Sequence, residues 1–401
     1  MRILYHHRTQ CLDGQRVHIR EIQDALRAQG HEVLEVSPVP AHEAAGETPV
    51  PTWRRRCLTA LTGVSPPGVY ELLELGYNAV ACRNLARAIR RFRPDFLYER
   101  YALNTVAGAW VSRRFGVPLL LEVNSPLAEE KRRLGQLVLH GLARRLENDT
   151  LRQATRVLAV TGVLRRTLIE QAGLDPERVL VVQNGVRPEA FDRPAAEREA
   201  RRQALDLRGR LLVGAVGFFR PWHGIDLLLR CVARNPVLRE RVHVLLVGEN
   251  PGLPEEAARL GIAGQVTFAG SVPHAEVPSY LAAMDIGLIP RAVEYASPLK
   301  LFEYLAAGMA ILAPRQENLM EILTEGEDAV CFTPEDAAGL EASLLRLVQD
   351  EGLRRRLGAA ARQTIHRRGL TWAGNAARIV QAFEELRAAR PAAAAPAEAL
   401  A

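Results

Sequence analysis

The chain has 401 residues, of which 48% are hydrophobic and 24% charged, and its formal net charge is +6. At roughly 150 residues per domain, this length predicts two domains, each large enough to bury a core of its own. The composition is typical of a globular protein, and no stretch approaches the roughly 20 apolar residues that span a bilayer. A disordered chain and a membrane-embedded bundle are therefore excluded.

The start of the chain, its cysteines and its basic residues narrow the function further. The first ten residues carry charge and lack the apolar core of a secretory signal, so we expect a cytoplasmic protein. The five cysteines form no C-x-x-C pair, which gives zinc and dithiol chemistry no support. Basic clusters such as those at 131–133 and 144–145 are interpreted as solvated helix faces, with phosphate-bearing substrates or an anionic membrane surface as alternatives. We expect no nucleic-acid binding, because the basic residues are scattered without an aromatic motif.

The first half of the chain alternates short apolar runs with helical patterns. The run at residues 2–5 precedes a polar loop through Gly14, and an amphipathic helix follows that Gly30 is expected to end. The predicted buried side of this helix holds Val17, Ile19, Ile22 and Leu26. Further strands are predicted at residues 31–36, 96–98, 118–123, 157–160 and 179–182.

Residues 41–68 interrupt this alternation. The segment is rich in proline, glycine and alanine, then basic, then apolar at helical spacing from Trp53 to Val64. We interpret it as a helix that packs on its own domain; a helix that docks on a membrane or an acceptor is the alternative.

A second series begins after Asn184-Gly185-Val186 and a charged stretch at residues 193–210. Its strands are predicted at 211–216, 242–247, 266–268, 286–289 and 310–313, and its helices from about Gly224, at 274–283 and from Pro298. Two successive series of this kind predict an α/β protein with two Rossmann-like, doubly wound domains. We expect the two domains to face each other across a cleft, with ligands beyond the carboxyl ends of the strands.

The segment SPLKLFEYLAAG is the most informative candidate site. Ser297 can cap a helix and Pro298 suits its first position, which leaves the backbone amides of Leu299 and Lys300 available for a diphosphate. Glu303 follows about one turn later and can accept hydrogen bonds from ribose hydroxyls. The alternative is that Lys300 and Glu303 form a surface ion pair.

A second candidate loop runs from Gly217 to Gly224, between an apolar strand and a helix. Arg220 and His223 of this loop could both donate hydrogen bonds to phosphate oxygens. A strand–glycine–helix turn is a weak signal by itself, because many such loops look alike.

Two loops of the first half complete the candidate residues. Gly14 permits close backbone approach to a ligand, and His18 follows in the first turn of the helix. Glu122, Asn124 and Ser125 come at the end of a core strand, where polar side chains often face a ligand. The alternatives are a structural histidine and a loop that makes its own turn hydrogen bonds.

Taken in order, these segments resemble family 4 retaining glycosyltransferases, whose fold is GT-B. The resemblance runs from Met1 to about Leu386 and includes DGQRVHIREIQDALRAQGHEV, VVQNGV, GFFRPWHGIDLLL, VHVLLVGE and SPLKLFEYLAAGMAILAP. It implies an acceptor-binding domain at residues 1–188, completed by a helix at 370–387, and a nucleotide-sugar-binding domain at residues 189–369. The low-complexity tail at 391–401 is expected to be disordered.

The resemblance also assigns roles in the donor-binding domain. Glu303 corresponds to the second glutamate of the family's E-x7-E motif, whereas the first falls on Tyr295, so that Glu294 is the nearest substitute. The family's lysine corresponds to His223 and its arginine to Phe218. Arg220 is the replacement cation, and Lys300 is the second candidate for that catalytic role.

In the acceptor-binding domain, the resemblance adds His18 and Asn124 as catalytic residues. His18 falls where relatives place a histidine in the amino-terminal glycine loop. Asn124 falls where many relatives have a histidine that contacts the sugar, and Glu122 lies close to it in sequence.

The implied reaction transfers a sugar from a UDP- or GDP-sugar to a hydroxyl acceptor, with retention and in polysaccharide or glycolipid assembly. We expect no cofactor, and no metal because the sequence has no D-x-D motif. The acceptor is not identified: it is a lipid-linked molecule near the inner membrane or a secondary metabolite. Two other functions stay open, a nucleotide-sugar epimerase on the same fold and a catalytically inactive partner subunit.

Overall fold

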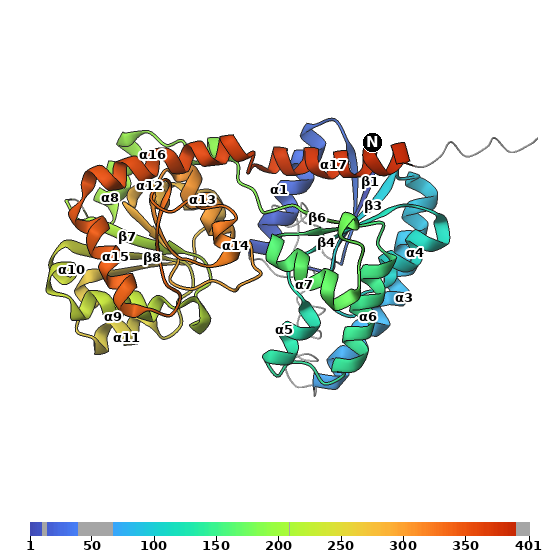
Figure 1. Cartoon of the computed structure of the whole chain (residues 1–401), viewed down its shortest axis with the longest axis horizontal. Helices are drawn as coiled ribbons and strands as arrows, with labels where there is room; N and C mark the ends of the chain where they lie inside the picture. The colour runs from blue at the N-terminus through green and yellow to red at the C-terminus, as the bar shows by residue number, and fades with distance from the viewer. Residues whose placement is uncertain (10–13, 39–66, 208, 390–401) are drawn as a thin grey trace, which may run out of the picture. The chain divides into compact units, whose positions relative to one another are not determined.

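The computed structural model describes residues 1–9, 14–38, 67–207 and 209–389 (Figure 1). The chain divides into two compact units. The N-terminal unit consists of residues 1–159, 165–182 and 373–401, and the C-terminal unit of residues 160–164 and 183–372. Each unit contains one six-stranded sheet whose paired strands are all parallel. The predicted fold class, two Rossmann-like α/β domains, is confirmed.

The N-terminal sheet has the strand order β2-β1-β3-β4-β5-β6. Its strands are β1 (Arg2–His6), β2 (Glu32–Val36), β3 (Phe96–Arg100), β4 (Leu119–Val123), β5 (Arg156–Ala159) and β6 (Val179–Val181). Its helices are α1 (Gly14–Ala28), α3 (Pro67–Phe92), α4 (Ala107–Phe115), α5 (Leu127–Arg133), α6 (His140–Gln153), α7 (Gly162–Ala172) and α17 (Trp372–Ala389). Helix α17 returns to this sheet, where the ring centroids of Phe383 and Phe96 are 4.8 Å apart.

The buried face of α1 differs from the prediction by one residue. The buried side chains are those of His18, Ile19, Ile22, Gln23 and Leu26, whereas Val17 is only half-buried. Two polar side chains can be buried here because each binds a carboxylate: His18 contacts Glu122, and Gln23 contacts Glu35. Hydrophobic periodicity could not reveal these long-range partners. Gly30 follows the helix with φ +82°, as its predicted place at the helix end requires.

The C-terminal sheet has the order β12-β11-β10-β7-β8-β9. Its strands are β7 (Leu211–Val216), β8 (Val242–Val247), β9 (Val266–Gly270), β10 (Ile286–Leu288), β11 (Ala310–Pro314) and β12 (Ala329–Phe332). Its helices are α8 (Ala195–Ala204), α9 (Ile225–Arg234), α10 (Pro236–Arg241), α11 (Leu253–Arg259), α12 (Val277–Ala283), α13 (Leu299–Ala307), α14 (Glu317–Met320), α15 (Ala337–Gln349) and α16 (Glu351–Arg368). Read from β9, this is the strand order of dinucleotide-binding Rossmann sheets.

Three predictions for the C-terminal unit needed correction. The charged stretch at 193–210 contains helix α8, and β12 was not expected. The helix expected at 274–283 begins with a 3₁₀ turn, His274–Glu276, and becomes α-helical only at Val277.

The strand orders locate where each unit can bind a ligand. In an open parallel sheet, the crevice lies at the carboxyl ends of the two strands between which the strand order reverses. In the C-terminal unit these strands are β7 and β10, and in the N-terminal unit they are β1 and β3. The loops that follow these four strands therefore hold the side chains to be searched for chemistry.

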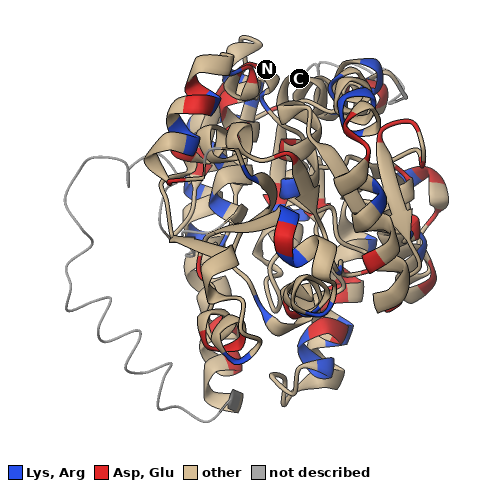
Figure 2. Ribbon diagram, turned by 90° about the vertical axis from the view of Figure 1, so that its left-hand side faces the viewer, with Lys and Arg blue, Asp and Glu red and all other residues tan. Residues whose placement is uncertain are grey.

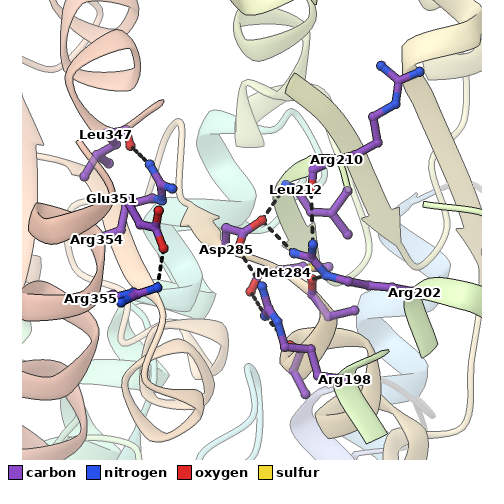
Figure 3. Close-up of polar contacts among 12 residues, drawn as sticks. Arg198, Arg202, Arg210, Leu212, Met284, Asp285, Leu347, Glu351, Arg354 and Arg355 are labelled. Carbon is purple, nitrogen blue, oxygen red and sulfur yellow. Dashed lines mark hydrogen bonds and ion pairs between the residues drawn. The ribbon is translucent and has the colours of Figure 1, made fainter. Parts of the chain in front are cut away.

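Helix α8 is fixed to the C-terminal sheet by one carboxylate (Figure 3). Asp285 lies 2.5 Å from an Nη atom of Arg198 and 2.7 Å from an Nη atom of Arg202. It also accepts a hydrogen bond from the backbone amide of Leu212 at 2.7 Å. Two charges of the arginine-rich stretch therefore have a common partner at the amino ends of the central strands β7 and β10.

Replacement of Asp285 by asparagine should lower the free energy of unfolding by about 2 kcal/mol, because hydrogen bonds to a charged group are lost. Urea denaturation measures the change. Glu351→Gln is the matched control, since the pair of Glu351 with Arg355 in Figure 3 is exposed and screened by solvent. Equal effects of the two variants would contradict an anchoring role for Asp285.

Two sequence predictions lie outside the described residues, namely the helix expected within 41–68, apart from the start of α3, and the tail at 391–401. Among the helices that are described, none is both long and apolar enough to span a bilayer. Basic and acidic residues are interspersed along many of the described helices (Figure 2).

Candidate active site

Two glycines bring the backbones after β7 and β8 into contact. Gly217 and Gly248 both have φ +126°, a conformation that L side chains rarely adopt. A Cβ atom on Gly248 would lie 2.0 Å from the carbonyl oxygen of Gly217. A Cβ atom on Gly217 would lie 3.7 Å from Nζ of Lys300. The Lys300 side chain therefore extends from α13 to the loop after β7, which brings two predicted site residues together.

Lys300 is half-buried, and burial lowers the pKa of its amine to about 8. Its Nζ atom lies 5.8 Å from the ring centroid of Phe219, a buried residue of the loop after β7. A cation in such surroundings lacks part of its hydration, so a bound anion would interact with it strongly.

His223 lies in the 3₁₀ turn Pro221–His223 of this loop. Its Nδ1 atom accepts a hydrogen bond from the backbone amide of Arg220 at 3.1 Å. Burial, together with the charges of Lys300 and Arg220, lowers its pKa to about 4. The ring is therefore neutral near neutral pH, with Nδ1 as an acceptor and the remaining hydrogen on Nε2. A hydrogen bond with the backbone of Phe218 acts in the opposite direction and raises the pKa. The side chain of Arg220 is exposed.

The start of α13 differs from the prediction in its cap. The helix begins at Leu299 with Pro298 as its N-cap, and no side chain caps it. The Oγ atom of Ser297 instead accepts a hydrogen bond from the backbone amide of Asn184 at 3.1 Å. The Asn184 side chain in turn donates to the Ser297 carbonyl at 2.5 Å. Since the first amides of a helix have no intrahelical partner, those of Leu299 and Lys300 stay available to an anion.

The loop between β10 and α13 is held by side chains that the sequence did not single out. Asn318 donates hydrogen bonds to the carbonyls of Val293 at 3.0 Å and Ala296 at 2.7 Å. The hydroxyl of Thr161 donates to the carbonyl of Tyr295 at 2.9 Å. Glu294, the expected substitute for the family's first glutamate, is exposed on this loop.

Glu303 lies on the next turn of α13, with a side chain that is 12% exposed. One of its carboxylate oxygens is 3.1 Å from Nε2 of His274, in the loop after β9. Glu303 and Lys300 interact through their charges, since Glu303 acts to raise the pKa of Lys300. Among the described residues, however, the carboxylate of Glu303 makes its ion pair with His274. His274 was not predicted, because nothing in its local sequence indicates a partner on α13.

The N-terminal unit has a buried carboxylate, Glu122, at the end of β4. His18 lies 2.9 Å from it, and Tyr98 and Asn124 each donate a hydrogen bond to it at 2.6 Å. Arg100 also donates to it, from the position directly opposite in the register of β3 and β4. Burial alone would raise the pKa of Glu122, but the charges of His18 and Arg100 and the bonds from His18 and Asn124 hold it well below its usual range.

Glu122 and the four side chains that contact it form a hub. It brings together three of the predicted residues, His18, Glu122 and Asn124. Gly14 begins the same helix as His18, and Ser125 is half-buried after Asn124. Tyr98 and Arg100 were missed by sequence reasoning. The signal that could have found them is the sequence YER at the end of an apolar strand, because polar residues there tend to face a ligand.

A second buried pair lies at the ends of β1 and β3. Nδ1 of His6 is 3.5 Å from a carboxylate oxygen of Glu99, and both side chains are 1% exposed. Neither side chain makes a hydrogen bond within the described chain. A Cβ atom on Gly108 of α4 would lie 1.3 Å from the other oxygen of Glu99, so only glycine fits at that position. Polar groups thus gather at the strand-order reversal of this unit as well.

Comparison with known proteins agrees with this architecture. Residues 12–190 match the family described as Glycosyltransferase Family 4, and residues 197–364 match Glycosyl transferases group 1. The chain is 30% identical to the D-inositol 3-phosphate glycosyltransferase of Thermomonospora curvata over 309 residues, which are 72% of this chain and 71% of that protein. It is also 30% identical to the enzyme of the same name from Thermobispora bispora over 308 residues, 73% of this chain and 71% of that protein.

Solved structures show the same fold at lower identity. HepE of Anabaena in complex with UDP-glucose is 19% identical, with a TM-score of 0.71 over 96% of this chain and 100% of that one. Sucrose-phosphate synthase of Thermosynechococcus elongatus is 18% identical, with a TM-score of 0.72 over 97% of this chain and 100% of that one. The two Rossmann-like units, the matches over both of them and the identity to the two D-inositol 3-phosphate glycosyltransferases show that this chain is a glycosyltransferase of family 4 with the GT-B fold.

Proposed function

We propose that the protein transfers a sugar from a UDP- or GDP-sugar to a hydroxyl acceptor, with retention of configuration and without a metal ion. The observation that carries the proposal is the approach of Lys300 to Gly217, at the strand-order reversal of the C-terminal sheet. The amides that begin α13 and the nearby Arg220 complete a site for a diphosphate. Glu303, one turn along, suits the ribose hydroxyls. HepE, which has the same fold, was solved in complex with UDP-glucose, and this supports a UDP-sugar as the donor.

In the proposed reaction, the bond between the anomeric carbon and the diphosphate oxygen breaks as the acceptor oxygen bonds to the same face of that carbon. The departing diphosphate gains negative charge and takes the proton of the acceptor hydroxyl. Lys300, Arg220 and the helix amides stabilise that charge where it develops. His223, being neutral, contributes a hydrogen bond and no charge.

The N-terminal unit supplies the acceptor side of the proposed reaction through His18, Glu122, Asn124 and Ser125. Glu122 acts as a positioning residue, because its carboxylate fixes the orientation of both His18 and Asn124. We further propose that the acceptor belongs to polysaccharide or glycolipid assembly. The names of the relatives add D-inositol 3-phosphate to the acceptors worth testing.

A screen of UDP-, GDP-, ADP- and dTDP-sugars by thermal shift tests the donor, because a ligand that binds only the folded state raises Tm. The donor found is then incubated with and without a panel of acceptors that includes D-inositol 3-phosphate. We expect nucleoside diphosphate release that depends on an acceptor. A sugar epimerised without any acceptor would identify an epimerase instead, and binding without turnover on every acceptor would favour an inactive partner subunit.

Affinity for the nucleoside diphosphate should fall as pH rises above the pKa of Lys300, which is about 8. The protonated amine attracts the diphosphate and the neutral amine does not, so about a tenfold loss is expected between roughly pH 7 and pH 9. Isothermal titration with UDP and GDP measures it. In Lys300→Arg the side chain stays charged, and the loss should disappear; an unchanged profile in that variant would assign the titration to another group.

Replacement of Glu303 by glutamine should weaken nucleotide binding by about tenfold, because a charged acceptor for the ribose hydroxyls is lost. The affinity for 2′,3′-dideoxy analogues of UDP and GDP, which lack both ribose hydroxyls, should be the same in the variant and the wild type. This comparison separates contact with the ribose from a general effect on α13. Glu351→Gln on α16 is the control. Wild-type affinity of Glu303→Gln for UDP and GDP would refute the ribose contact.

A further inference from the structure

Helix α3 presents the opposite of the usual amphipathic arrangement in its first two turns. Leu72 and Leu73 are 60% and 51% exposed, whereas the neighbouring Glu71 and Glu74 are only 3% and 6% exposed. A surface helix normally buries its apolar side chains and exposes its charged ones. An apolar face that is exposed among the described residues therefore needs an explanation.

The orientation of α3 is fixed by the acidic residues that it buries. Glu71 accepts hydrogen bonds from the backbone amides of Val138 at 2.6 Å and Leu139 at 2.8 Å. Glu74 lies 2.6 Å from an Nη atom of Arg8, and Asn104 donates to it at 2.9 Å. Rotation of the helix to bury its leucines would break all four of these contacts. The outward leucines are thus a consequence of a stable arrangement.

The exposed apolar surface continues onto the connection between α5 and α6. Val138 is 61% exposed, and a Cβ atom on Gly68 at the start of α3 would lie 3.9 Å from it. Figure 1 shows the start of α3 together with α5 and α6 at one end of this unit. We call these side chains the α3 apolar face; they are Val69, Leu72, Leu73, Leu134, Val138 and Leu142, each at least 43% exposed.

Basic residues lie directly beside the α3 apolar face. Between residues 127 and 145 the chain has five basic residues, Lys131, Arg132, Arg133, Arg144 and Arg145, and two acidic ones, Glu129 and Glu130. The arginines are exposed, and Nζ of Lys131 lies 5.9 Å from the ring centroid of Tyr70 on α3. Arg132 and Arg133 share one carboxylate, that of Glu129, and Arg145 lies 3.9 Å from Asp149. The border of the apolar face therefore keeps an excess of positive charge.

We propose that the α3 apolar face docks on an anionic lipid surface. Leucine and valine side chains can enter the headgroup region while the lysine and arginines bind lipid phosphates, and the two contributions add. A second copy of the chain fits less well, because docking this face on itself would bring like charges together. The proposal concerns where the enzyme works and does not depend on the donor or the acceptor.

Sedimentation with lipid vesicles tests the proposal on the full-length chain. The vesicles are phosphatidylcholine with roughly one third phosphatidylglycerol, and phosphatidylcholine alone for comparison. We expect the wild type to bind the anionic vesicles and the double variant Leu72→Gln, Leu73→Gln to bind about tenfold less. Arg132→Gln, Arg133→Gln should also bind less, and the wild type should be released by salt.

The matched control is Arg355→Gln, Arg356→Gln on α16, which removes an exposed arginine pair from the C-terminal unit. It should bind vesicles as the wild type does. Equal binding of the leucine variant and the wild type would overturn the proposal, as would absence of binding by the wild type. A wild-type dimer in analytical ultracentrifugation that Leu72→Gln, Leu73→Gln converts to a monomer, with no vesicle binding, would assign the face to self-association. Nucleotide affinity, measured in parallel, should be the same in all variants and keeps this test separate from that of the proposed reaction.

Discussion

Replacement of Lys300 by methionine should lower kcat by about 10²–10³-fold, the effect of removing one preorganised group that stabilises charge in the transition state. The amine lies beside Gly217, where the diphosphate is expected to gain charge as it departs. Its burial, which lowers its pKa to about 8, means that little water competes with the leaving group for it. Single-turnover measurements with saturating donor and acceptor report this effect without contributions from binding.

Two further variants show whether the effect belongs to Lys300. Lys300→Arg keeps a cation and should retain part of the activity, whereas Arg220→Ala removes the exposed cation of the neighbouring loop. Wild-type turnover in Lys300→Met, with a large loss in Arg220→Ala, would show that Arg220 and not Lys300 stabilises the departing diphosphate. The methionine variant should fold normally, because it replaces a desolvated charge with an apolar side chain of similar length.

Replacement of Glu122 by glutamine should lower the free energy of unfolding by about 3 kcal/mol, because it leaves a buried guanidinium without its counter-charge. The guanidinium is that of Arg100, whose side chain is 9% exposed. Activity should fall as well, since His18 and Asn124 lose the carboxylate that orients them. Urea denaturation measures the stability. Glu129→Gln is the control, because Glu129 also binds two arginines, Arg132 and Arg133, but at the surface.

The effect of Glu122→Gln also has a defined pH dependence. The pKa of Glu122 is lowered in the folded state, so the carboxylate stabilises the fold above its unfolded pKa, near 4.3. This contribution is lost as pH falls towards the folded pKa. The difference in stability between wild type and Glu122→Gln should therefore be constant near neutral pH and shrink in acid. A difference that grows in acid would contradict a charged carboxylate in the hub.

The sequence predicted those features that depend on neighbouring residues. Strands β4 and β8 are buried along their whole length and mostly apolar, with one polar residue each, Glu122 and His243, and their predicted bounds agree within one residue. Strand β12 was missed, because four residues carry too little pattern to separate a strand from a loop. The fold class followed from the repeated alternation of strands and helices, which no single missed element alters.

The features that the sequence could not supply depend on partners far along the chain. Serine is a common helix-capping residue, yet the hydroxyl of Ser297 accepts a hydrogen bond from the backbone amide of Asn184, 113 residues away. His18 was a candidate because of its place in the first turn of α1, but its partner Glu122 lies 104 residues away and could not be predicted. Such pairs are decided by topology, and local spacing carries no information about them.

The backbone carbonyls of the loop from Val293 to Ser297 are bound by Asn318, Thr161 and Asn184, three side chains from separate parts of the fold. A loop constrained at so many points has little conformational freedom left to lose when a nucleotide sugar arrives. The entropy of ordering this loop is lost during folding, so a bound diphosphate would not have to offset it.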